Sequence, residues 1–140
     1  MQVQLEKAKA TANFTRFRGE KSGGHYESYF IRANNGETGQ AFWIRYTIYQ
    51  NETGKGEKSP MGELWAIWFE KGKPPIAAKS EFPLSKAEYS NSHFALNFDG
   101  ATLDAAGLKG SASNCGPNSI SWDLQVASLS NARNLSPIFP

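Results

Sequence analysis

Aromatic and aliphatic residues gather in three runs in the first half of the chain, and each run alternates between two kinds of position. The runs are YESYFIRAN, QAFWIRYTIY and GELWAIWFE, joined by the links NGETG and QNETGKGEKSPM, and together they cover residues 26–70. They are short for helices and rich in the β-branched and aromatic residues that suit a pleated surface. The pattern therefore predicts a three-stranded antiparallel meander.

Successive side chains of a strand point to opposite faces, so each run supplies two faces. The first predicted face is ordinary core material: Ser28, Phe30, Phe42, Ile44, Tyr46, Ile48, Leu64, Ala66 and Trp68. The second combines large rings with three charges: Glu27, Tyr29, Ile31, Trp43, Arg45, Thr47, Tyr49, Glu63, Trp65, Ile67 and Phe69. A solvated face rarely carries so many rings, so we expect the second face to be covered as well.

Further short alternating segments follow the meander, with turn residues between them. Residues 13–17, 76–82, 93–98, 102–103, 108–112 and 119–127 each fit a strand. Seven to nine short strands at this spacing predict an all-β, antiparallel barrel or sandwich. We expect it to occupy residues 13–127, after an N-terminal arm at 1–12 that forms a short helix or pairs with a sheet edge. Residues 128–140 end in an apolar tail and are expected to form a connector cut before a second domain.

Composition and charge exclude several classes of function. A net charge of +2, from scattered Lys and Arg residues, argues against nucleic acid as a partner. The longest apolar runs are too short to span a membrane. A lone cysteine, Cys115, is typical of a reducing, cytoplasmic location. His25 and His93 lack the spacing of metal ligands, so we expect neither a metal nor a cofactor.

Four segments carry a resemblance to a known family. ESYFIRA at 27–33, AFWIRY at 41–46, GELWAIWF at 62–69 and SWDL at 121–124 occur in an order that resembles the N-terminal domain of lipocalin-like proteins. These proteins are related to carotenoid 1,2-hydratase (hydroxyneurosporene synthase), tocopherol cyclase and fungal lipocalin-like cyclases. The similarity covers roughly residues 25–127.

The resemblance implies a calycin-like barrel packed against a second lipocalin-like domain or another copy of itself. It also implies an apolar, unsaturated ligand of terpenoid, carotenoid or polyketide type, and acid catalysis that protonates a carbon–carbon double bond to add water or close a ring. The alternative is a non-catalytic domain that binds an apolar ligand or serves as a scaffold. An unpaired buried carboxylate would favour the enzyme, and a closed ion pair would favour binding or a scaffold.

The main candidate site lies on the second face of the predicted meander. Pairing Ala33 with Ala41 would place Tyr29 opposite Arg45, and the next hairpin would place Thr47 opposite Glu63 and Arg45 opposite Trp65. Together with Glu27 and Trp43, these residues would form a charged cluster among rings. Glu63 is then either a proton donor, its pKa raised by burial, or one of two carboxylates neutralised by Arg45.

A second candidate site is the pair Trp122 and Asp123. Aspartate is disfavoured in the middle of a strand, so Asp123 requires an explanation. Alternation places Asp123 on the opposite face of the strand from Trp122, which is a candidate ligand-binding ring. Asp123 is either a second proton donor or an acceptor of hydrogen bonds from a neighbouring turn.

Overall fold

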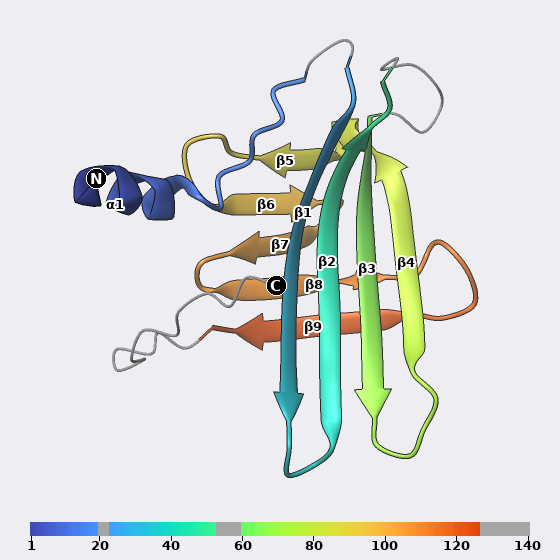
Figure 1. Ribbon diagram of the computed structural model, residues 1–140. Helices are drawn as coiled ribbons and strands as arrows, with labels where there is room; N and C mark the ends of the chain where they lie inside the picture. The colour runs from blue at the N-terminus through green and yellow to red at the C-terminus, as the bar shows by residue number, and fades with distance from the viewer. Residues whose placement is uncertain (20–22, 53–59, 127–140) are drawn as a thin grey trace.

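The computed structural model describes residues 1–19, 23–52 and 60–126, and this part of the chain is mostly β (Figure 1). A helix, α1 (Gln2–Thr11), precedes nine strands and one short 3-10 helix, η1 (Leu84–Lys86). The strands are β1 (His25–Asn35), β2 (Gln40–Gln50), β3 (Met61–Glu70), β4 (Ile76–Pro83), β5 (Ala87–Tyr89), β6 (Ala95–Phe98), β7 (Ala101–Asp104), β8 (Gly107–Ala112) and β9 (Ile120–Gln125).

The strands form two antiparallel meanders, β1-β2-β3-β4 and β5-β6-β7-β8-β9. The first sheet lies in front of the second in Figure 1, and the strands of the two sheets run crosswise. Within the described residues the sheets share only an isolated bridge between Lys79 of β4 and Cys115. The prediction of an antiparallel all-β fold is confirmed, whereas these two sheets do not close into a barrel.

The core lies between the two sheets and is filled by large rings. Tyr46 of the first sheet meets Phe98 and Trp122 of the second edge-on, with ring centroids 5.7 and 6.2 Å away. The Tyr46 hydroxyl donates to the Thr102 carbonyl at 2.9 Å and accepts from Trp122 Nε1 at 3.0 Å. Burial raises the pKa of Tyr46, so the hydroxyl keeps its proton. Packing and hydrogen bonding together hold the two sheets face to face.

The register of the first two hairpins decides which residues share a face. The prediction for β2 and β3 is confirmed: Thr47 lies opposite Glu63, and Arg45 opposite Trp65. The prediction for β1 and β2 is wrong by one residue, since Tyr29 lies opposite Tyr46 and Phe30 opposite Arg45. A slip of one residue moves every side chain of a strand to the other face.

Residues 15–17, which precede β1, explain this slip. They form hydrogen bonds with polar side chains of β1, and these side chains must therefore point to the inner side of the sheet. Glu27 and Tyr29 face inward and bond to residues 15–17, and Phe30 faces outward against Trp43. Residues 13–17 do not form the predicted strand. Isolated hydrogen bonds hold them instead: Thr15 N donates to the Ser90 carbonyl, and Asn91 Nδ2 donates to the Phe17 carbonyl.

The N-terminal helix stands apart from the sheets. The predicted N-terminal arm is helical as α1, which extends to one side and buries none of its residues (Figure 1). The predicted connector at 128–140 lies outside the described residues.

Candidate functional site

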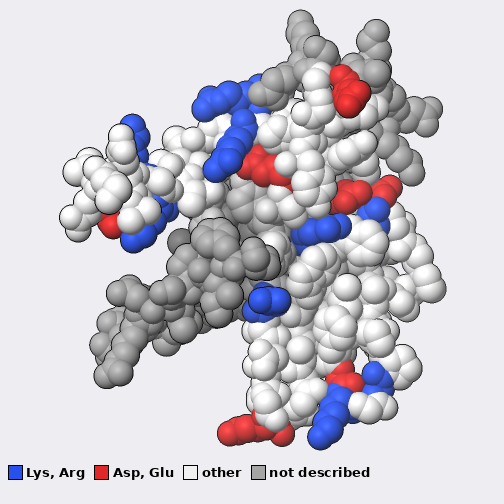
Figure 2. Space-filling view, viewed as in Figure 1, with Lys and Arg blue, Asp and Glu red and all other residues white. Residues whose placement is uncertain are grey.

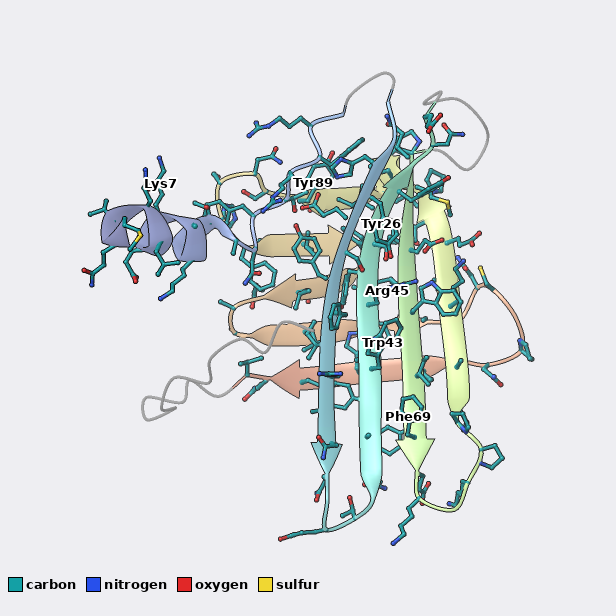
Figure 3. All side chains as sticks on the ribbon, viewed as in Figure 1. Lys7, Tyr26, Trp43, Arg45, Phe69 and Tyr89 are labelled. Carbon is teal, nitrogen blue, oxygen red and sulfur yellow. The ribbon has the colours of Figure 1, made fainter. Side chains whose placement is uncertain are left out.

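The outward side of the sheet β1–β4, here called the outer face, carries the most unusual set of side chains in the molecule. The strand register arranges them in rows across the sheet: Tyr26–Tyr49, Ser28–Thr47–Glu63–Glu81, Phe30–Arg45–Trp65–Lys79, Arg32–Trp43–Ile67–Ala77 and Asn34–Ala41–Phe69. Figure 3 shows Tyr26, Arg45, Trp43 and Phe69 following one another along this face. Tyr26 and Phe30 are 62% and 59% exposed. Such an apolar patch is typical of a binding surface.

Arg45 lies between two tryptophans at the centre of the outer face. Its guanidinium carbon is 5.2 Å from the ring centroid of Trp43 and 5.7 Å from that of Trp65. Nη1 donates to the Tyr26 hydroxyl at 3.3 Å, whereas the buried Nε has no hydrogen-bond partner among the described residues. Both rings attract the cation through their π faces. Arg45 therefore holds the two indoles together.

The cation that pairs with Glu63 is Lys79, not the predicted Arg45. Lys79 Nζ lies 3.2 Å from Glu63 Oε1, contacts Glu81 Oε1 as well, and sits 4.8 Å from the ring centroid of Trp65. Burial lowers the pKa of Lys79, but the bonds to Glu81 and Glu63 outweigh this effect and raise it. Within the described residues, Glu63 is thus one carboxylate of a closed ion-pair group on β3 and β4.

A groove of about 590 Å³ lies on β1, β2 and β3. In the view of Figure 1 it lies nearer the lower end of the sheet than the ion-pair group does. Trp43, Ile67 and Phe69 form its apolar wall, and Arg32 and Asn34 lie along its β1 side. In the space-filling view, mostly uncharged surface separates the charges near the middle of this face from those at its lower end (Figure 2). The groove therefore offers an apolar wall against which an apolar molecule can bind.

Trp122 and Asp123 lie apart from the outer face. Trp122 is 7% exposed and belongs to the core between the sheets. Asp123 points to the opposite side of β9, where it is exposed and lies 2.9 Å from Lys109 Nζ. The predicted placement of these two neighbours on opposite faces of the strand is therefore confirmed.

Glu27 and Tyr29 form a third, inward-facing cluster that anchors the N-terminal segment. The Glu27 carboxylate accepts from the backbone N–H of Arg16 and Phe17, at 2.9 and 3.2 Å, and from the Tyr29 hydroxyl at 2.7 Å. His25 Nε2 lies 3.0 Å away. Burial raises the pKa of Glu27, but the bonds from Tyr29, His25 and the backbone outweigh it, and the pKa lies below its usual value. This carboxylate is held in its ionised form.

The lowered pKa of Glu27 predicts a stability that depends on pH. Glu27→Gln should lower the free energy of unfolding by about 1.5–3 kcal/mol at neutral pH, because it removes charge-assisted hydrogen bonds. Since the folded-state pKa lies below the unfolded value, this contribution is present above the unfolded pKa of about 4.5 and disappears as the pH falls through the folded pKa. Urea melts of both proteins at neutral pH and at about pH 3 measure the difference. An equal difference at both pH values would contradict the prediction.

Sequence reasoning missed four residues of the outer face: Arg32, Phe30, Lys79 and Glu81. The alternation of IAAKSEF places Lys79 and Glu81 on one face of the fourth strand, so aligning the third hairpin would have found the pair with Glu63. Phe30 was assigned to the core face through the register error in β1, and Arg32 was assigned to neither face.

Comparisons with known proteins found no matching family model, no similar curated protein and no similar solved structure. Within the described residues no group of three or more His, Cys, Asp or Glu side chains is placed to hold a metal ion. No helix in the same residues has the length and hydropathy needed to cross a membrane.

Proposed function

We propose that this chain is a non-catalytic, lipocalin-like binding domain that holds an apolar small molecule in the groove of the outer face. The observation that carries the proposal is the groove itself. Its volume of about 590 Å³ lies within the range of about 300–1,000 Å³ that is usual for small-molecule sites. Its wall of Trp43, Ile67 and Phe69 offers apolar surface from two neighbouring strands.

The pairing of the candidate acids supports binding over acid catalysis. Glu63 is bonded to Lys79, and Asp123 lies beside Lys109. Neither carboxylate lines the groove, so neither is placed to protonate a ligand bound there. A closed ion pair is the arrangement expected of a binding or scaffold domain.

The filling of the core supports a site on the outer face over one between the sheets. Tyr46, Phe98 and Trp122 are 0%, 0% and 7% exposed, and they occupy the space between the sheets. The resemblance to lipocalin-like proteins supports the class of ligand, an unsaturated terpenoid, carotenoid or polyketide. A second lipocalin-like domain belongs to the same proposal, since the family usually pairs two such domains.

Binding of neutral apolar probes tests the proposal. Nile red, followed by its fluorescence, and β-ionone as a competitor should bind the purified chain. Ile67→Ser should weaken both by about tenfold or more, because burying an Ile side chain stabilises by about 1.5–3 kcal/mol. Ile76→Ser is the matched control: Ile76 is 47% exposed on β4 and does not line the groove. The affinity of the Ile76→Ser variant for both probes should stay within about twofold of that of the original chain.

Two results would count against the groove. Equal weakening by Ile67→Ser and Ile76→Ser would mean that the probes bind exposed rings without selecting a site. Absence of probe binding, together with self-association that Ile67→Ser abolishes in analytical ultracentrifugation, would favour the scaffold alternative. In that case the rings of Tyr26 and Phe30, with Arg45, have the composition of a protein interface.

A further inference from the structure

The groove has one polar side, and this side identifies the class of its ligand. We propose that the ligand is an amphipathic monocarboxylate, with its carboxylate bound by Arg32 and Asn34 and its apolar body against Trp43, Ile67 and Phe69. The inference rests on the proposed function, since it concerns the same groove. It adds the charge that the ligand must carry.

Arg32 and Asn34 lie two positions apart on β1, so both point to the outer face, about 7 Å from each other along the strand. Both line the groove. Within the described residues neither side chain has a hydrogen bond or an ion pair, unlike the other polar groups of the outer face. A guanidinium and an amide N–H on one side of an apolar groove are the donors that a carboxylate requires.

Among the cationic side chains of the outer face, Arg32 is the one that a ligand can reach from the groove. Lys79 forms ion pairs with Glu63 and Glu81, and the guanidinium of Arg45 lies over the rings of Trp43 and Trp65. Arg32, by contrast, is exposed and pairs across the strands with Trp43, which in turn pairs with Ile67. The charge thus borders the apolar wall directly.

The geometry discriminates among ligands with the same apolar body. A carboxylate gains charge-assisted hydrogen bonds from the planar fork of Arg32. A neutral alcohol gains weaker bonds, and an ammonium group is repelled by Arg32. We therefore expect the order carboxylate, alcohol, amine.

Decanoate, decanol and decylamine differ only in the head group and test this order by competition with Nile red, below the concentrations at which they form micelles. Decanoate should bind about tenfold more tightly than decanol, a difference of about 1.4 kcal/mol. Decylamine should bind most weakly. Arg32→Gln should abolish the preference for decanoate and leave decanol unchanged, because the apolar wall is intact. Arg16→Gln removes the same charge from another exposed arginine outside the groove and should keep the preference.

The outcomes separate this inference from the proposed function. Equal binding of decanoate and decanol by the original chain would overturn the inference and leave the groove as a neutral apolar site. A preference for decanoate that survives in Arg32→Gln would also overturn it, because another cation would then bind the head group. Failure of all three probes and of Nile red would remove the proposed function itself. Arg32 is exposed, so its substitution leaves the fold intact, and circular dichroism spectra check this.

Discussion

Trp122→Ala is expected to lower the free energy of unfolding by about 3–5 kcal/mol, the largest loss among the substitutions considered for this protein. The change removes a ring that packs 6.2 Å from Tyr46 and leaves a cavity between the sheets. It also removes the donor of the hydrogen bond to the Tyr46 hydroxyl. Urea unfolding followed by circular dichroism measures the loss.

Phe69→Ala is the control for this prediction. Phe69 is also a large ring at a strand position, but it is partly exposed on the outer face. Its truncation should cost about 1 kcal/mol or less, while weakening probe binding in the groove. If Trp122→Ala left stability unchanged and weakened probe binding instead, Trp122 would be a ligand-binding residue, as the sequence suggested.

Lys79→Met should have the second largest effect, a loss of about 3 kcal/mol, at the lower end of the range for breaking a buried pair. It leaves the partly buried carboxylates of Glu63 and Glu81 side by side without a cation. Glu63→Gln should cost less, about 1–2 kcal/mol, because Glu81 continues to neutralise Lys79. The double variant should lose less than the sum of the two, with a coupling of about 1 kcal/mol. Thermal or urea melts of the three variants give this coupling.

Arg45→Met distinguishes the observed pair from the one predicted first. Arg45 contacts Trp43 and Trp65 through its guanidinium plane, so combining Arg45→Met with Glu63→Gln should give additive losses. A large loss in Glu63→Gln that Arg45→Met restores would show that Arg45 and Glu63 are the true partners. Unchanged stability of Glu63→Gln with loss of a hydratase or cyclase activity would instead favour the enzyme.

Local pattern was sufficient for much of this fold and for part of the site. Strict alternation in QAFWIRYTIY and GELWAIWFE determined two strands and both of their faces, because a strand has only two sides. A register for the second hairpin comparable to that assumed for the first gave the observed pairing of these two strands. The grouping of Trp43, Arg45 and Trp65 was therefore predictable, and it forms the centre of the outer face.

Tertiary structure decided what the alternation left open. In YESYFIRAN both alternating sets contain large rings, so the pattern does not say which set is buried. The choice was made by the segment at 15–17, which precedes β1 and whose backbone N–H groups donate to the Glu27 carboxylate. That one contact turned Phe30 and Arg32 outward and gave the groove its polar side.

The ion pair of Glu63 was likewise predictable in part from the sequence and in part only from the tertiary structure. The sequence by itself determined that a carboxylate lies among rings on an outer face, which requires a cation nearby. Which cation it is depended on the arrangement of strands: β4 lies beside β3 and brings Lys79 next to Trp65, whereas the rings of Trp43 and Trp65 hold Arg45. Alternation is a property of a single strand, but pairing depends on which strands become neighbours, and the packing of the whole chain determines that.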